Sequence, residues 1–179
     1  MKLLAFAASS SRNSINAKLV QAALKIIQAD LAPGAAVETL DLNDFEMPIF
    51  SVDREAADGV PAPARLFFDK ISAADALLIS FAEHNGSYTA AFKNVYDWSS
   101  RIDAKVFQQK PMVALATSPG GRGGATVLGV VESTTPHFGA DLRGVFSLPK
   151  FYDAFDAETM TLKEPAKAAE LRDALAKLF

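Results

Sequence analysis

Hydroxyl and guanidinium groups gather in one short stretch near the start of the chain. The stretch SSSRNSIN, residues 9–16, holds four serines and Arg12, and it joins an apolar run to a helix-like pattern. A helix N-terminus offers free N–H groups and the positive end of the helix dipole, and an arginine fork matches phosphate geometry. The pattern therefore indicates a phosphate site. Capping alone, by Ser14 or Asn13, explains one serine but not four serines and an arginine.

The same stretch lacks both common glycine-based nucleotide motifs. A dinucleotide fingerprint needs G-x-G-x-x-G at this turn, and a P-loop needs G-K-[ST]. Residues 9–16 contain neither glycine nor lysine. Hydroxyl donors of this kind suit a monophosphate better than a pyrophosphate that lies against bare backbone.

A second polar stretch, AEHNGSYT at residues 82–89, follows another apolar run. Asn85 and Gly86 form a turn signal, and Ser87 or Thr89 can cap the helix that follows. The turn and the cap do not account for the Glu-His pair before them. His84 can be read as a general acid, but a lone histidine in a loop is more often a surface residue or a hydrogen-bond partner.

A third stretch, SPGGRGG at residues 118–124, has four glycines in seven residues between a strand-like and a helix-like segment. Glycine is costly in entropy and contributes no packing. A glycine-rich backbone with free N–H groups can lie flat against a planar polar ring and donate to it. The alternative is a plain flexible connection, although such connections are not normally so dense in glycine beside a buried strand.

These three stretches are joined by alternating strand-like and helix-like patterns. The predicted strands cover 2–8, 35–42, 75–82, 111–117 and 141–147. The predicted helices cover 15–26, 64–72, 88–101, 125–135 and 164–179, and 43–63 is predicted to be a long loop because it mixes prolines with polar residues. The alternation predicts an α/β fold, a doubly wound five-stranded parallel sheet with helices on both faces.

Ligands of such sheets bind at the carboxyl ends of the strands. The polar stretches follow the first, third and fourth predicted strands, so we expect them to face one crevice. The residues alone leave both common doubly wound strand orders open.

Composition narrows the classes of protein. A chain of 179 residues with no internal repeat or linker predicts a single domain over 1–179. The net charge of −3 argues against a nucleic-acid surface, and the lack of cysteine excludes thiolate chemistry. The start, MKLLAFAASSSR, reads as a buried strand and not as a signal peptide. No apolar run approaches the ~20 residues of a membrane span, so we expect a cytoplasmic location.

The three stretches together resemble the NAD(P)H-dependent FMN reductase family of the flavodoxin-like fold. That family carries Gly-Ser-x-x-Arg/Lys-x-Ser-x-Asn, then Pro-Glu-Tyr-Asn-Gly-Ser with Lys-Asn-x-x-Asp-Trp, then Thr-Ser-x-Gly-x-x-Gly-Gly. This chain reads ASSSRNSIN, then AEHNGS with KNVYDWSSR, then TSPGGRGG. It departs from the pattern at Ala8, Ala82 and His84, where the family usually has glycine, proline and tyrosine.

The resemblance implies a three-layer flavodoxin-like sheet of order 2-1-3-4-5 and an FMN site. It assigns the FMN phosphate to Ser9, Arg12, Ser14 and Asn16. It assigns one edge of the isoalloxazine ring to Glu83, His84, Asn85 and Gly86, largely through backbone groups, and the other side to Ser118, Gly120 and Gly124. Arg122 can reach a pyridine-nucleotide phosphate or remain a solvated loop residue.

The resemblance also implies an enzyme. NADPH or NADH would pass hydride to the flavin, and a small-molecule acceptor would then take its place. No catalytic side chain and no metal is expected, and a homodimer or homotetramer is implied. Core packing is the more frequent use of the aromatic residues near these motifs, but they are also candidates for an interface or for substrate stacking. They are Tyr88, Phe107, Phe151, Tyr152 and Phe155.

Other interpretations remain open at this point. A flavodoxin-type electron carrier usually has a strongly acidic surface and aromatic residues on both sides of the flavin, and a net charge of −3 with a glycine loop favours a reductase instead. A non-catalytic phosphate-binding or flavin-binding domain is a second alternative. The acceptor of a reductase can be a flavin, a quinone, an azo dye or a metal oxyanion.

Overall fold

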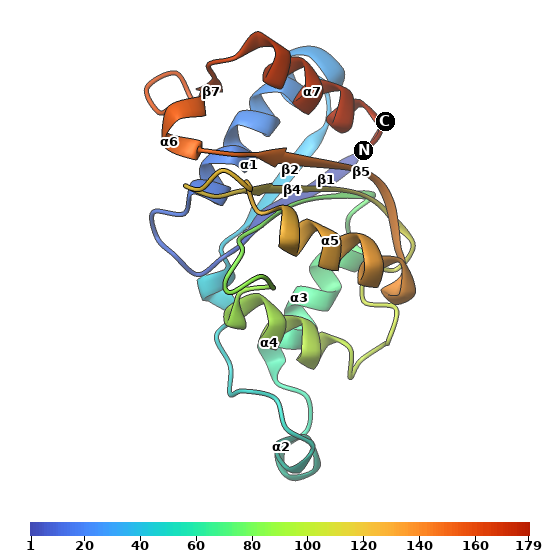
Figure 1. The fold of residues 1–179 in the computed structure, drawn as a ribbon. Coiled ribbons are helices and arrows are strands. Elements are labelled where there is room, and N and C mark those ends of the chain that lie inside the picture. Colours follow the sequence, from blue (N-terminus) through green and yellow to red (C-terminus); the bar gives the residue numbers. More distant parts are fainter.

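A parallel five-stranded sheet forms the centre of the computed structural model, which describes residues 1–179. The strand order is β2-β1-β3-β4-β5, and every neighbouring pair is parallel (Figure 1). The strands are β1 (Lys2–Ala8), β2 (Ala36–Leu40), β3 (Ala76–Phe81), β4 (Lys110–Thr117) and β5 (Ala140–Leu148). The predicted fold class and strand order are therefore confirmed.

The burial of each strand follows its place in the sheet. All six residues of β3 are buried, as are six of the seven residues of β1, since helices cover both faces of these strands. The edge strand β5 alternates between covered and exposed positions, and the edge strand β2 has no buried residue. The continuous apolar runs in the sequence thus mark the central strands, whose ends carry the polar loops.

Helices on the two faces of the sheet enclose two separate cores. One core lies between the sheet and the helices α1 (Ile15–Ile26) and α7 (Pro165–Ala176). The other lies under α3 (Ala62–Ser72), α4 (Ala90–Ser99) and α5 (Ala125–Thr134). This division follows from right-handed crossovers, because only the connection from β1 to β2 runs in the opposite direction along the sheet.

The sequence analysis was wrong in part about residues 43–63. Instead of one long loop, this region contains a 3₁₀ turn at Leu42–Phe45 and the helix α2 (Val52–Asp58). Short elements near the C-terminus were also not predicted: the helix α6 (Phe151–Ala154) and an antiparallel pair, β6 (Phe155–Asp156) with β7 (Thr161–Leu162). A π-helical turn, Ile27–Leu31, extends α1.

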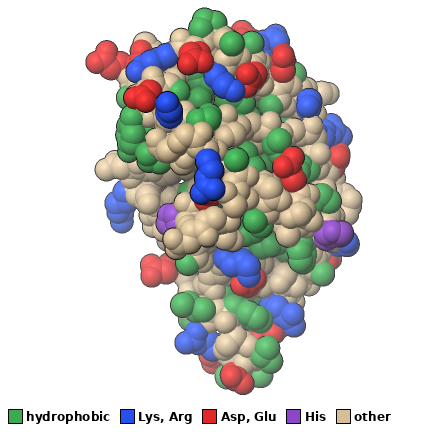
Figure 2. Space-filling view, in the orientation of Figure 1, with side chains coloured by type: hydrophobic (Ala, Val, Ile, Leu, Met, Phe, Trp, Pro, Cys, Tyr) green, Lys and Arg blue, Asp and Glu red, His purple; other side chains and the backbone are tan.

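Residues 46–58, here called the arm, carry α2 away from the body of the protein (Figure 1). In the same orientation, Figure 2 shows hydrophobic side chains among charged ones at this lower end of the molecule. No residue of α2 is buried. The helix therefore depends on its cap, where the Ser51 hydroxyl accepts a hydrogen bond from Arg54 N, and on contacts at the base of the arm.

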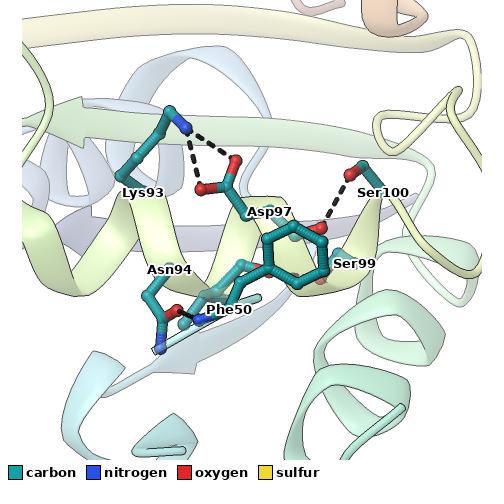
Figure 3. Close-up of polar contacts among 7 residues, drawn as sticks. Phe50, Lys93, Asn94, Asp97, Ser99 and Ser100 are labelled. Carbon is teal, nitrogen blue, oxygen red and sulfur yellow. Dashed lines mark hydrogen bonds and ion pairs between the residues drawn. The ribbon is translucent and has the colours of Figure 1, made fainter. Parts of the chain in front are cut away.

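The helix α4 holds the base of the arm (Figure 3). The Asn94 amide accepts a hydrogen bond from Phe50 N at 2.8 Å and donates to the carbonyl oxygens of Met47 and Pro48 at 3.1 and 3.2 Å. The Trp98 indole N–H donates to the same Pro48 oxygen at 2.7 Å, and its ring meets Phe50 edge to face at 5.0 Å. The motif KNVYDWSSR therefore anchors the arm.

Charges complete this anchor. The Arg101 guanidinium pairs with Glu55 of α2 at 3.0 Å and lies 5.8 Å from the centre of the Phe50 ring. Lys93 and Asp97 pair one helical turn apart, on the exposed side of α4 (Figure 3).

None of the helices is both long enough and apolar enough to cross a bilayer.

We predict that Glu38→Gln lowers the free energy of unfolding at neutral pH by up to about 1 kcal/mol, the range of partly exposed ion pairs. The Glu38 carboxylate lies between Lys2 (2.7 Å) and Lys70 (2.5 Å), and its hydrogen bonds to these lysines, Lys2 first, lower its pKa. A lowered folded-state pKa means that the stabilisation is complete above the ordinary glutamate range and is lost as pH falls through the lowered value.

Denaturant unfolding of both proteins as a function of pH measures this effect. The difference between them should shrink to zero in acid, where the wild-type carboxyl is also uncharged. The matched control is Glu132→Gln, at an exposed glutamate of α5 that forms no ion pair, and it should change stability little at any pH. A Glu38→Gln deficit that persists undiminished in acid would contradict the assignment.

Candidate functional site

The three polar loops meet at one cavity of about 230 Å³ at the carboxyl edge of the sheet. The cavity is lined from the loop after β1, the loop after β3 and the loop after β4, as expected for a doubly wound sheet. Six of the predicted site residues line it: Ser9, Ser14, Asn16, Glu83, His84 and Ser118. Arg12, Asn85, Gly86, Gly120 and Gly124 do not line this cavity and lie in the same three loops.

The first loop presents free donors at the start of α1. Ser14 is the N-cap, and its hydroxyl oxygen accepts a hydrogen bond from Ala17 N. The Ser9 hydroxyl oxygen likewise accepts from Ser11 N at 3.2 Å. Neither hydroxyl proton is used within the chain, and the N–H groups of Ile15 and Asn16 donate no hydrogen bond. These donors, at the positive end of a helix, make a suitable site for an anion.

Arg12 is exposed and forms no ion pair with another residue of the chain. It lines a neighbouring cavity of about 240 Å³, between α1 and the end of β2. Ser9, Ser11 and Ser14 line both cavities. The first loop therefore lies between the two cavities. Its three serines line both cavities, whereas Arg12 lines only the neighbouring one.

The Asn16 side chain has a task other than the expected phosphate contact. Only 3% of Asn16 is exposed, and its amide forms three hydrogen bonds inside the protein. The oxygen accepts from Ser80 Oγ at 2.8 Å and from Thr117 N at 3.1 Å, while the nitrogen donates to Thr117 O at 3.3 Å. The backbone N–H of Asn16 and the second proton of its amide nitrogen form no hydrogen bond within the chain, so these two donors remain for an anion.

The second loop is a tight hairpin. Asn85 and Gly86 both have positive φ (53° and 77°), and His84 and Ser87 exchange both of their backbone hydrogen bonds, at 3.0 and 3.1 Å. Thr89 then caps α4 and donates to Ala8 O at 3.0 Å, which joins the end of this loop to the end of β1. The Asn-Gly turn signal and one of the two predicted caps are thus confirmed.

Glu83 connects the second loop to the helix that follows the third. Its carboxylate accepts a hydrogen bond from Val127 N, in the first turn of α5, at 2.9 Å. Gly86 lies against the same turn, since a Cβ there would be 3.5 Å from the methyl group of Thr126. A carboxylate at a helix N-terminus is favourable, and here it holds two loops together.

The glycines of the third loop fall into two classes. Gly123 and Gly124 have positive φ (59° and 80°) and no room for a side chain. A Cβ at Gly123 would be 2.7 Å from Pro149 N, and one at Gly124 would be 2.7 Å from the Cβ of Ala116. Gly120 and Gly121 have neither constraint, because a Cβ at Gly120 would meet only Ser118 Oγ at 3.9 Å and one at Gly121 would meet nothing. The fold itself requires only the second pair.

Several cavity residues lie beyond those that the family resemblance assigns to the site. Ser11, Asn13 and Thr117 line it beside the predicted residues. Tyr152, one of five aromatic residues considered, also lines it and is largely exposed, whereas the other four pack in the core. Hydrogen bonds from Lys150 N to Gly120 O and from Phe151 N to Ser118 O bring Tyr152 to the third loop. No sequence pattern marks this long-range contact.

Comparisons with known proteins show which sequences and folds the chain is similar to. The family model of the NADPH-dependent FMN reductases matches residues 1–156. The chain is 33% identical over 120 residues to an NAD(P)H-dependent FMN reductase of Pseudomonas aeruginosa, covering 67% of this chain and 61% of that protein. It is 30% identical over 125 residues to a probable NADPH:quinone oxidoreductase 2 of Oryza sativa subsp. japonica, covering 70% and 59%.

The matched part thus spans about three fifths of the length of these curated relatives. Among solved structures, the fold is similar to that of FerB, a flavoenzyme NAD(P)H:(acceptor) oxidoreductase of Paracoccus denitrificans. The TM-score is 0.75 at 23% identity, covering 99% of this chain and 94% of that one. At this identity the similarity supports the fold.

We predict that Gly123→Ala destabilises the protein by more than about 2 kcal/mol, because a left-handed backbone costs an alanine ~1–2 kcal/mol and the overlap with Pro149 adds to this. Gly121→Ala is the matched control in the same loop. It should change stability by less than about 1 kcal/mol and can stabilise, since it restricts the unfolded chain. Equal losses in the two variants by thermal or denaturant unfolding would contradict the division of the glycines.

Proposed function

We propose that the cavity at the carboxyl edge of the sheet is an FMN site, from the premise that the chain belongs to the NADPH-dependent FMN reductase family. The reaction that this site supports best is the NAD(P)H-dependent reduction of a small acceptor through the bound flavin. The observation that carries the proposal is the meeting of three donor-rich loops around one cavity. Their order along the chain and the strands they follow agree with the family motifs.

The first loop fits the phosphate of FMN. The N–H groups of Ile15 and Asn16 and the hydroxyl protons of Ser9 and Ser14 are all free to donate. The dipole of α1 favours a negative charge at this position. Arg12, which no carboxylate neutralises within the chain, supplies a full positive charge from the adjacent wall of the loop.

The second and third loops fit the edges of a planar ring. The N–H groups of Glu83, Asn85 and Gly86 form no hydrogen bond within the chain, nor do those of Gly120 and Gly121. The space above Gly120 and Gly121 is open, so a flat ligand can approach the backbone there. The Glu83–Val127 hydrogen bond holds these two loops in a fixed relation to each other.

FMN, when bound, supplies the hydride chemistry, and this chain binds and orients the reactants. The free backbone donors of the second and third loops would bind the polar edges of the ring and would stabilise negative charge there. His84 lines the cavity, but the proposal assigns it no proton transfer. The name of the rice relative supports a quinone as acceptor, while a flavin, an azo compound or a metal oxyanion is a further possibility.

We also propose that the chain forms a homodimer, or a homotetramer built from such dimers, through the arm. Ile49 and Val52 are 74% and 71% exposed, although the base of the arm is held firmly by Asn94 and Trp98. A cavity of about 370 Å³ beside the arm is lined in part by Leu42, Phe45, Met47, Ile49, Ala90 and Ala91. Ser10, Asn43, Glu46 and Asn94 line the rest of this recess. An apolar projection beside a recess that has apolar residues on part of its wall can pair with a second copy of itself across a two-fold axis. The cytoplasmic location stays a prediction.

We predict that purified wild-type protein supplemented with FMN shows the visible absorption of bound flavin, and that NAD(P)H bleaches it quickly under anaerobic conditions. A protein that remains colourless with added FMN would contradict the flavin site, and slow bleaching would favour an electron carrier.

Arg12→Ala should weaken FMN binding roughly ten- to a hundredfold, as expected for a lost charge-assisted hydrogen bond of ~1.5–3 kcal/mol.

Riboflavin lacks the phosphate, so its affinity should be the same for Arg12→Ala and wild type. The control is Arg172→Ala, at an exposed arginine of α7 that forms no ion pair, which should change neither affinity. Equal losses of FMN and riboflavin affinity in Arg12→Ala would show that Arg12 acts through folding or through the ring.

We predict that Ile49→Asp lowers the molar mass measured by light scattering from that of an oligomer to that of one chain, because burying a carboxylate against the apolar residues of the recess, without a partner, is unfavourable. Val145→Asp, at a less exposed apolar residue of β5, is the control and should keep the wild-type mass. A wild-type monomer, or dissociation by Val145→Asp alone, would reject the arm as the contact.

A further inference from the structure

The Asn16 amide fills a gap at the point where two central strands part. The β3–β4 ladder ends at the pair of Ser80 with Leu115, and β4 continues to Thr117. At Thr117 the Asn16 side chain takes the place of a neighbouring strand, because its oxygen and nitrogen pair with the N–H and C=O of that one residue. The same oxygen also accepts from the hydroxyl of Ser80, at the end of β3.

This arrangement connects all three loops of the site. Asn16 lies in the first turn of α1, directly after the first loop. Ser80 precedes the second loop by two residues, and Thr117 immediately precedes Ser118 of the third loop. All three partners are nearly or fully buried, so water does not compete for these hydrogen bonds.

We propose that Asn16 is a positioning residue whose side chain sets the relative placement of the three loops, and that it acts on the flavin through them and not by touching the phosphate. The proposal rests on the proposed function and deepens it. The residues on either side of the gap, Ala82 to His84 and Thr117 to Pro119, line the cavity together with Asn16 itself. A change in the separation of the two strand ends therefore changes the shape of the site.

The chemistry of the gap calls for asparagine. One short side chain must offer an acceptor to two donors and a donor to one carbonyl oxygen, within a space closed to water. Aspartate offers no donor for Thr117 O unless it is protonated, and leucine, of similar size, leaves the Thr117 N–H unpaired. An unpaired buried donor is unfavourable enough to move the strand ends apart.

The test compares variants of two buried serines with a variant of Asn16. Ser80→Ala removes one of the hydrogen bonds to Asn16, while Ser99→Ala removes a buried hydroxyl bond of similar length that is local to α4, from Ser99 Oγ to Val95 O at 2.7 Å. Both serines are fully buried. Asn16→Leu removes all three bonds. Each protein is titrated with FMN and with riboflavin at a temperature where circular dichroism shows it folded, and the visible spectrum of the bound flavin is recorded.

We expect Asn16→Leu to weaken the binding of FMN and of riboflavin by the same factor, about tenfold or more, and to shift the visible spectrum of the bound flavin. Ser80→Ala should weaken the binding of both ligands by a smaller common factor, about two- to fivefold. In the Asn16→Leu background it should cause no further loss of affinity. Ser99→Ala should lower the melting temperature and leave both affinities and the spectrum unchanged. If Asn16→Leu does not fold, Ser80→Ala against Ser99→Ala still decides the question.

Three results would overturn the positioning role. A loss of FMN affinity without a loss of riboflavin affinity would make the Asn16 side chain a phosphate ligand. Unchanged affinities in a folded Asn16→Leu or in Ser80→Ala would show that the network only stabilises the fold. Affinity losses in Ser99→Ala as large as those in Ser80→Ala would show that the loss of affinity follows from a general loss of stability. Wild-type protein that binds neither flavin would instead reject the proposed function, and the positioning role with it.

Discussion

The parting of β3 and β4 at their carboxyl ends is the constraint on which the site depends. In a doubly wound sheet the loops after the strands turn to opposite faces, and the cavity lies at the carboxyl edge where they diverge. Here the β3–β4 ladder stops at Ser80, while β1 and β3 remain paired as far as Ala8 and Phe81. The opening exposes backbone groups of Thr117, and one buried amide pairs with them. The hydrogen bonds of this amide thus hold together the ends of β3 and β4, which lead into two of the loops that line the cavity.

The glycines of the third loop serve two different purposes. Gly123 and Gly124 allow the chain to pass close to the ends of β5 and β4 and to start α5 from a left-handed residue. Gly120 and Gly121 have open space where a side chain would stand, although the Gly120 carbonyl oxygen accepts a hydrogen bond from Lys150 N. From the sequence, all four glycines indicated a ligand against the backbone. In three dimensions the fold accounts for half of them, and only the other two leave room for a flat molecule.

Sequence patterns predicted the elements that depend on interactions between residues close together in the chain. The central strands were identifiable because both of their faces are buried, and the helix starts at Ser14 and Thr89 because caps bond within a few residues. The arm was missed because α2 is short, buries nothing and is held by α4, about 45 residues further along the chain. The role of Asn16 was missed for the same reason, since Thr117 lies 101 residues away. Residue type showed that Asn16 is polar and near a helix start, but not which way its amide points.

The helix α4 joins the arm to the second loop as one rigid piece. It begins at the Thr89 cap, which is bonded to the end of β1, and its next turns carry Asn94 and Trp98, which hold the base of the arm. A helix of ten residues transmits a displacement of one end to the other, because its hydrogen bonds fix the distance between them. Any contact that holds the arm therefore also restrains Thr89 and the hairpin before it. No residue of the motif that follows the second loop, KNVYDWSSR, lines the cavity at the carboxyl edge, and the motif instead couples a surface feature to one wall of the site.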